Sequence, residues 1–166
     1  MRYVSGRNRP RRAVQRAARG FTLMELIVAT AIMVILTGMA VPLARVTIKR
    51  EKERILRHDL WEMRDAIDRY KDAADRGAFQ IKLGSEGYPP DLDTLVEGVS
   101  AANDATGRKL KFLRRVPIDP MTKSTEWGLR SYQDEADSDR WGGQDVFDVR
   151  TKSEGTALDG SKYKNW

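Results

Sequence analysis

Cysteine is absent from this chain of 166 residues, and histidine occurs once, as His58. The lack of cysteine excludes disulfide bonds, thiolate metal ligands and cysteine nucleophiles. His58 has no nucleophile or metal ligand at helical spacing, and no glycine-rich phosphate loop follows a predicted strand. We therefore expect His58 to lie at the surface, and we do not expect an enzyme.

Acidic residues are missing from residues 1–20, which contain seven arginines: Arg2, Arg7, Arg9, Arg11, Arg12, Arg16 and Arg19. Without this segment the formal charge falls from +6 to 6 − 7 = −1. A basic arm can bind nucleic acid. Directly before an apolar run, however, it is typical of the flank that stays in the cytoplasm while the following chain crosses the membrane. We expect a membrane partner and no nucleic acid.

Charge is also scarce in the next segment, where Glu25 is the only charged residue between Phe21 and Ala44. The 19 uncharged residues from Leu26 to Ala44 form about 28 Å of helix, enough to cross a bilayer. A carboxylate at the edge of lipid costs on the order of 2.5–3.5 kcal/mol, so Glu25 requires a cation or a cap. Thr22 stands at capping-box spacing from Glu25, and this alternative stays open.

Gly38 and Pro42 interrupt the apolar run. Glycine costs about 1 kcal/mol relative to alanine inside a helix, and proline removes a backbone hydrogen bond. The two residues predict a kink or local melting of the helix. A tolerated kink in an ordinary membrane anchor explains them equally well.

Residues 45–76 are rich in charge, but their apolar residues recur mostly at steps of three and four: Ile48, Leu56, Leu60, Met63, Ile67, Tyr70 and Ala74. This spacing predicts an amphipathic continuation of the helix with one buried face. Gly77 is placed to end the helix. The membrane segment 21–44 and this continuation should therefore form one long helix.

Residues 77–166 predict a small head with short elements. Asp91 is placed to cap a short helix over 91–96, and residues 127–133 and 146–151 have the aromatic and β-branched content of strands. We expect an antiparallel meander packed on the long helix, which gives an α+β fold. Tyr163 and Trp166 should dock into the head and hold the last residues in place of a disulfide.

A resemblance to a known family rests on Gly20-Phe21-Thr22-Leu23-Met24-Glu25-Leu26. This stretch resembles the processing signal of type IV pilins and type II secretion pseudopilins. The resemblance implies that a prepilin peptidase removes residues 1–20 by cutting after Gly20 and methylates the new amine of Phe21. It further implies that Phe21, Thr22 and Glu25 act in assembly, with Glu25 pairing with the Phe21 amine of a neighbouring subunit.

Two proline-containing stretches narrow the resemblance to the major pseudopilins, the G subunits of type II secretion. Tyr88-Pro89-Pro90 and Val116-Pro117-Ile118-Asp119-Pro120 are similar to that family's landmarks, and the lack of cysteine favours it over type IV pilins. The resemblance implies a single-pass inner-membrane protein with its C-terminal head in the periplasm. Its partners would be further copies of itself, minor pseudopilins, the prepilin peptidase, and an inner-membrane assembly platform with its ATPase. A type IV pilin or minor pseudopilin for motility or DNA uptake is an alternative, as is a signal-anchored periplasmic enzyme or binding domain.

Major pseudopilins bind calcium in a loop near the C-terminus, and Thr151–Gly160 resembles that loop. It carries fewer acids than the family's pattern, and Asp159 is the best candidate ligand. The resemblance leaves calcium open as the one cofactor, with a solvated turn as the alternative.

Overall fold

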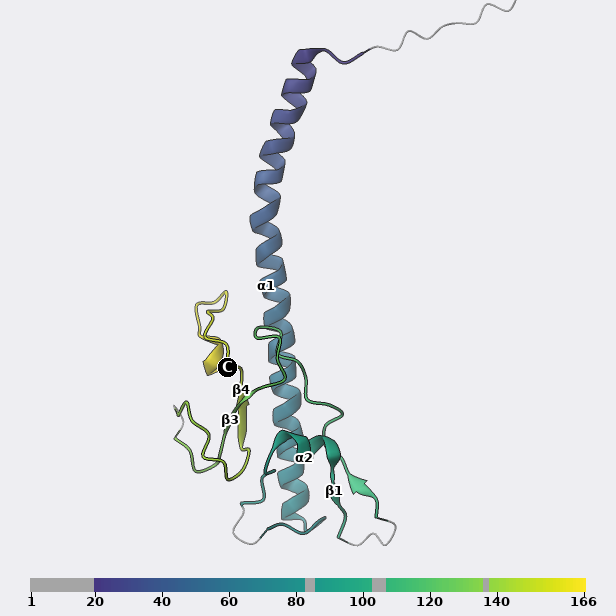
Figure 1. Ribbon diagram of the computed structural model, residues 1–166, viewed down its shortest axis with the longest axis vertical. Coiled ribbons are helices and arrows are strands. Elements are labelled where there is room, and N and C mark those ends of the chain that lie inside the picture. The colour runs from purple at the N-terminus through teal and green to yellow at the C-terminus, as the bar shows by residue number, and fades with distance from the viewer. Residues whose placement is uncertain (1–19, 83–85, 103–106, 136–137) are drawn as a thin grey trace, which may run out of the picture. The chain divides into compact units, whose positions relative to one another are not determined.

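The computed structural model describes residues 20–82, 86–102, 107–135 and 138–166, with only the backbone of residues 39–42 (Figure 1). The helices are α1 (Leu23–Asp75), α2 (Leu92–Glu97) and a 3-10 helix, η1 (Tyr163–Asn165). The strands are β1 (Val99–Ser100), β2 (Lys109–Leu110), β3 (Gly128–Arg130) and β4 (Asp148–Arg150). The chain divides into two compact units, Met1–Pro42 and Leu43–Trp166. Residues 1–19 of the predicted basic leader 1–20 lie outside the described residues.

The C-terminal end of α1 is closed by a hydrogen-bonded glycine cap. Gly77 has a φ of 67°, which glycine adopts without steric penalty. The N–H of Ala78 donates to the carbonyl of Ala73 and that of Gly77 to the carbonyl of Ala74, both at 2.9 Å. This pair of bonds is a Schellman motif, and it confirms the prediction that Gly77 ends the helix.

The core of the second unit forms along one side of α1. Leu56, Leu60, Met63 and Ile67 are at most 2 % exposed, and Tyr70 and Ala74 are also buried, as the periodicity predicts. They pack with Leu95 of α2, with Val149 of β4 and with Val146 before it. The prediction that Ile48 is buried is wrong: its side chain is exposed, because burial on this half of α1 begins at Glu53.

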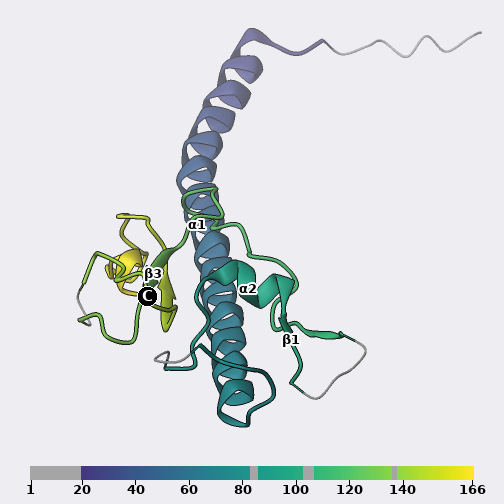
Figure 2. The ribbon, with the colours of Figure 1, turned by 60° about the horizontal axis from the view of Figure 1, so that its bottom comes forward.

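Two separate two-stranded sheets flank this half of α1. β1 pairs antiparallel with β2, and β3 pairs antiparallel with β4 with Leu129 opposite Val149. In both ribbon views β1 and β3 lie on opposite sides of the helix, and α2 crosses it (Figure 2). The predicted single meander is therefore wrong, although the α+β class is confirmed and β3 and β4 fall inside the predicted stretches.

The segment between β2 and β3 explains why the strands do not join into one sheet. Pro117 and Pro120 lack the N–H that a strand ladder needs. Between them Asp119 is fully buried and forms a turn, because its Oδ1 accepts the N–H of Met121 at 2.7 Å. Its Oδ2 accepts the hydroxyl of Thr151, the residue after β4. Asp119 therefore ties the turn to the sheet of β3 and β4.

The short helix α2 begins where the sequence predicts. Asp91 accepts the N–H and the hydroxyl of Thr94 at 2.7 Å each, which satisfies an otherwise unpaired donor of the first turn. The carbonyl of Leu95 then accepts the N–H groups of Phe112 and Leu113. The cap thus positions α2 so that it holds the chain that follows β2.

Candidate functional site

The predicted processing and assembly residues stand at the start of α1. Thr22 is the cap of the helix: its hydroxyl accepts the N–H of Glu25 at 3.2 Å, and its carbonyl accepts the N–H of Leu26 at 3.1 Å. Phe21 precedes the cap and is 75 % exposed. At Gly20 an added Cβ would meet nothing within 4 Å among the described residues, and its φ is not positive. The local fold therefore gives no steric reason for glycine at this position.

The carboxylate of Glu25 is not used by the cap. Only the backbone N–H of Glu25 bonds to Thr22, and the residue is exposed. Among the described residues the carboxylate has neither a hydrogen-bond nor an ion-pair partner. The half of a capping box that would use this carboxylate is therefore missing, and the charge remains available to a cation from outside the subunit.

The apolar part of α1 is built to lie in a non-aqueous environment. By length and composition this helix is long and apolar enough to cross a membrane. Its most apolar 18-residue window has a mean hydropathy of 2.4 and contains no buried residue. The hydroxyls of Thr30 and Thr37 donate hydrogen bonds to backbone carbonyls one turn earlier in the helix, at 2.8–3.0 Å. These bonds satisfy the hydroxyl donors of Thr30 and Thr37 within the helix, as an apolar environment requires.

The predicted kink lies at the end of the first unit. The backbone is helical through Gly38 and Pro42, and the boundary between the two compact units follows Pro42. An added Cβ at Gly38 would meet nothing within 4 Å. A bend at these residues stays a prediction, and local melting is not observed in the isolated subunit.

Comparison with known proteins finds one match, which covers the start of α1 and the residues before it. Residues 15–41 match the family described as the prokaryotic N-terminal methylation motif. The match supports a pilin-like protein. No curated protein and no solved structure matches the chain.

The matched motif also bears on processing and assembly. It implies processing by a prepilin peptidase and polymerisation into a pilus-like filament, and it suggests a structural rather than a catalytic role. Together with the apolar helix it fits a membrane-anchored protein. The long apolar helix with small antiparallel sheets is a pilin-like architecture. The individual roles of Gly20, Phe21, Thr22 and Glu25 stay predictions.

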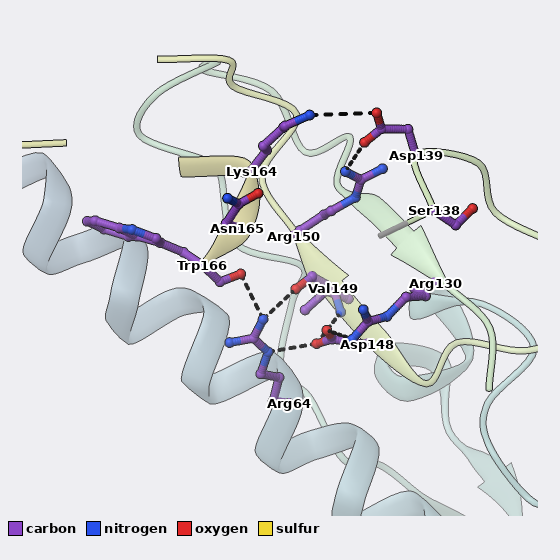
Figure 3. Close-up of a pocket in the computed structure, with 10 residues that line it drawn as sticks. All are labelled: Arg64, Arg130, Ser138, Asp139, Asp148, Val149, Arg150, Lys164, Asn165 and Trp166. Atoms are coloured by element: carbon purple, nitrogen blue, oxygen red, sulfur yellow. Dashed lines mark hydrogen bonds and ion pairs between the residues drawn. The ribbon is translucent and has the colours of Figure 1, made fainter. Parts of the chain in front are cut away.

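The head contains a polar pocket of about 600 Å³ beside β4. Figure 3 shows that Arg64 reaches from α1 toward its floor, where it bonds to Asp148 at 2.7 Å and to the main-chain oxygens of Val149 and Trp166 at 3.0 and 2.9 Å. Arg130 binds the other oxygen of Asp148 at 2.7 Å. These contacts join α1, β4 and the C-terminal segment.

Glu53 fastens the C-terminal segment above this pocket. Its Oε1 accepts the N–H of Leu158 at 2.8 Å and the hydroxyl of Tyr163 at 2.9 Å, and Glu53 and Tyr163 are buried. Burial, followed by the bond to Glu53, raises the pKa of Tyr163 to about 12. Trp166 packs edge-on against Tyr163 and carries the guanidinium of Arg57 at 4.0 Å from its ring centre. The predicted aromatic clasp is confirmed.

Sequence reasoning missed the polar half of this clasp. Glu53 and Arg64 look like ordinary charges on an amphipathic helix, and their partners lie 84 to 110 residues further along the chain. No local pattern marks such residues. Position offers the only signal, since Glu53 falls three residues before Leu56 on the buried side of the helix.

The residues around Asp159 do not fit a calcium site. Its carboxylate accepts the N–H and hydroxyl of Ser161 and pairs with the guanidinium of Arg57 at 3.3 Å. These bonds hold the pKa of Asp159 below its usual range. Calcium needs six to eight oxygen ligands, and within the described residues no three acidic, histidine or cysteine side chains gather at one place. The guanidinium of Arg57 lies beside the Asp159 carboxylate, where a calcium ion would need further oxygen ligands.

Proposed function

We propose that the chain is a filament-forming structural subunit, the major pseudopilin of a type II secretion system. The observation that carries the proposal is the carboxylate of Glu25, which has no partner among the described residues and stands at the head of an exposed apolar helix. A charge in that place is unfavourable in lipid. It becomes favourable when a cation of a second subunit reaches it.

Processing supplies that cation. Gly20 has open space around it and no positive φ, so recognition by a peptidase, rather than the fold, accounts for glycine here. Cleavage after Gly20 creates an amine at Phe21, which is exposed directly before the cap. In the proposed assembly, as the family resemblance implies, the partner of Glu25 is the Phe21 amine of another copy.

Assembly then depends on packing and on this ion pair. Lipid is as apolar as the leucine and isoleucine side chains of α1, so burying them against neighbours gains little hydrophobic free energy. The pair between Glu25 and Phe21 gives the assembled state a charge interaction that the subunit in lipid lacks. It therefore favours addition of subunits in one register.

The head supports the pseudopilin assignment through its proline landmarks. The carbonyl of Pro89 accepts the N–H of Val146 at 2.7 Å, and that of Pro117 accepts the indole N–H of Trp127 at 3.0 Å. Both proline-containing stretches are therefore bonded to residues that directly precede or lie near β3 and β4. The chain has no cysteine, and Glu53, Arg57 and Arg64 fasten its C-terminal segment instead.

The mechanism that follows is mechanical. Subunits leave the inner membrane at an assembly platform driven by its cytoplasmic ATPase, with minor pseudopilins as the other filament components. Growth of the filament in the periplasm pushes folded cargo toward the outer-membrane secretin. The chain contributes a helix that can exchange lipid for neighbouring helices and a head that stays folded during the transfer.

The test is the behaviour of Glu25→Ala in cells that lack the native gene. We expect loss of sheared filaments and periplasmic retention of secreted proteins, because the neighbour's amine loses its partner. Glu62→Ala, a change at a half-buried glutamate of α1 within the head, is the matched control and should secrete normally. Secretion and filaments unchanged in Glu25→Ala would overturn the proposal. Loss of surface motility with normal secretion would identify a type IV pilin instead.

A further inference from the structure

The polar pocket beside β4 carries more positive than negative charge. Its described lining includes two carboxylates, those of Asp139 and Asp148. Four cationic side chains lie around them, one each from α1, β3, β4 and η1: Arg64, Arg130, Arg150 and Lys164 (Figure 3). The described lining residues therefore have a formal charge of 4 − 2 = +2. A cleft with an excess of one sign of charge attracts ligands of the opposite sign.

Asp148 is shared between two of these cations. Its Oδ1 accepts a hydrogen bond from Nε of Arg64, and its Oδ2 accepts one from Nη2 of Arg130, each at 2.7 Å. A carboxylate carries a single negative charge, so Asp148 balances only one of the two guanidinium groups.

Asp139 is shared in the same way by Arg150 and Lys164. Its Oδ1 accepts a hydrogen bond from Nη1 of Arg150 at 2.7 Å, whereas its Oδ2 lies 3.7 Å from Nζ of Lys164, too far for a hydrogen bond. Within the described part of the chain neither Nζ of Lys164 nor Nη2 of Arg150 makes a hydrogen bond. Both nitrogens therefore have N–H donors to offer to a ligand.

The sequence of β3 lets the side chain of Arg150 lie close against that strand. Gly128 pairs with Arg150 in the strand register, and a Cβ at Gly128 would stand 2.9 Å from Cγ of Arg150. The side chain of Arg150 is 22 % exposed, and its Nε is buried without a hydrogen-bond partner among the described residues. A buried donor without a partner is unusual in a folded protein. The packing thus fixes this guanidinium in the pocket before any ligand arrives, which lowers the entropic cost of binding.

We propose that this pocket binds a doubly charged phosphoryl group, with Nη2 of Arg150 and Nζ of Lys164 as its main donors. Near pH 7 a phosphate monoester carries a charge of about −1.5 to −2, which matches the excess positive charge of the lining. An arginine fork can bond two phosphate oxygens side by side, and a lysine adds a point charge. A single carboxylate on a ligand would balance only half of the excess.

The pocket has room for more than the phosphoryl group itself. Its volume of about 600 Å³ lies within the range of small-molecule sites. Asp148 and Arg150 point to the same face of β4 about 7 Å apart, so the two groups of charges lie within reach of one ligand. Asn165 also lines the pocket and adds an amide that can bond to hydroxyls of an attached group. A bound ligand would join β4 to η1, a role separate from filament assembly.

The first experiment is calorimetric titration of glycerol 3-phosphate into the full-length protein in neutral detergent at low ionic strength. We expect saturable binding to the wild type. Arg150→Gln and Lys164→Gln should each weaken it about tenfold, because each removes a charge-assisted hydrogen bond. The seven arginines of residues 1–20 are the same in every variant, so differences between variants measure the pocket.

Lys152→Gln is the matched control for these losses. It removes one positive charge two residues from Arg150, but Lys152 lines a different pocket and pairs with Glu126. Its affinity for glycerol 3-phosphate should stay within about twofold of wild type. Equal losses in Lys152→Gln and Arg150→Gln would show non-specific attraction by the head and overturn the proposal. Unchanged binding in both Arg150→Gln and Lys164→Gln would overturn it as well.

A gain of affinity provides a test that does not depend on how well the arginine variant folds. Asp139→Asn removes the carboxylate that competes with a ligand for Arg150 and Lys164, and we expect binding about tenfold tighter. Glu126→Gln makes the same change of net charge outside the pocket and should leave the affinity unchanged. No gain in Asp139→Asn, or the same gain in Glu126→Gln, would contradict the site.

Three further probes separate the possible sources of the phosphoryl group. Equal affinity for inorganic phosphate and glycerol 3-phosphate would support a site for free phosphate, whereas tighter binding of the ester would support a site for a phosphate monoester. Glycerol alone should not bind. Acetate that binds more tightly than either phosphate compound would overturn the proposal, because the pocket would then be a carboxylate site.

Discussion

At the scale of single residues, Glu53 shows how the head manages without a disulfide. One carboxylate oxygen of this buried side chain accepts both an N–H and a phenol hydroxyl from the C-terminal segment. Charge-assisted hydrogen bonds of this kind are stronger than those between neutral groups. The two donors are five residues apart, so one residue on α1 holds the C-terminal segment at two points.

Replacing Glu53 by alanine should destabilise the protein strongly. The hydroxyl of Tyr163 would remain buried without an acceptor and the N–H of Leu158 would lose its partner, which we expect to lower the free energy of unfolding by about 2–4 kcal/mol. Thermal unfolding of the full-length protein in detergent measures the change. Glu62→Ala should lie close to wild type. A melting temperature for Glu53→Ala equal to that of the control would mean that the segment is held elsewhere.

Asp59, unlike Glu53, destabilises the folded protein when it is ionised. It is buried on the core side of α1, and burial is the main cause that raises its pKa above 3.8, with Glu62 and Asp119 adding to the effect against His58. A carboxyl whose pKa is higher in the folded state binds its proton more tightly there. Its ionisation therefore opposes folding at pH values above the raised pKa and has no effect below 3.8.

Asp59→Asn should accordingly raise the melting temperature at pH 7. The gain should shrink as the pH falls through the raised pKa and vanish near pH 3, where the carboxyl is protonated in both states. Melting curves of wild type and variant at a series of pH values provide the measurement. A gain that is independent of pH would show that the carboxylate charge is not the cause.

At the scale of elements, α1 is one helix whose two halves meet different surroundings. The first half is apolar and exposed, with its threonine hydroxyls bonded to its own backbone. The second half buries Leu56, Leu60 and Met63 in the head and leaves Trp61 outside. A change of sequence pattern near Ala44, rather than a break in the backbone, therefore marks where the anchor ends and the head begins.

Side chains of α1 hold the loop from Thr151 to Gly160. Asp159 pairs with Arg57, and Glu53 accepts the N–H of Leu158. We expect the melting temperature of the full-length protein to be the same in excess calcium and in excess chelator, because Arg57 and Ser161 already engage the carboxylate of Asp159. A rise of several degrees in calcium would reveal a site that these contacts do not account for.

Local patterns in the sequence predicted the helix, its glycine cap, the cap of α2 and the approximate places of β3 and β4. These features depend on residues close together in the chain, such as Gly77 with Ala74. The split into two sheets was not predicted, because β1 and β2 have two residues each, too few to show alternation. Glu25 was visible as a lone charge in an apolar run, whereas Arg64 was hidden among other charges.

At the scale of the whole molecule, the chain combines two features. Its apolar helix carries the unpaired carboxylate of Glu25, and the C-terminal segment of its head is held by side chains of α1. The match over residues 15–41 supports a pilin-like protein that is processed and polymerises. In the proposed pseudopilin each step adds an anchor to the helical core of a filament and a head to its surface. The central claim is that residues 1–20 are removed so that Phe21 can present its amine to a neighbour's Glu25.

The mass of the mature protein tests this claim most directly. Intact-mass and N-terminal peptide spectrometry would be applied to protein from cells that contain the prepilin peptidase and from cells that lack it. We predict a product that begins at N-methylated Phe21 in the first case and the uncleaved chain in the second. A leader that is retained in both, or a first residue other than Phe21, would contradict the account.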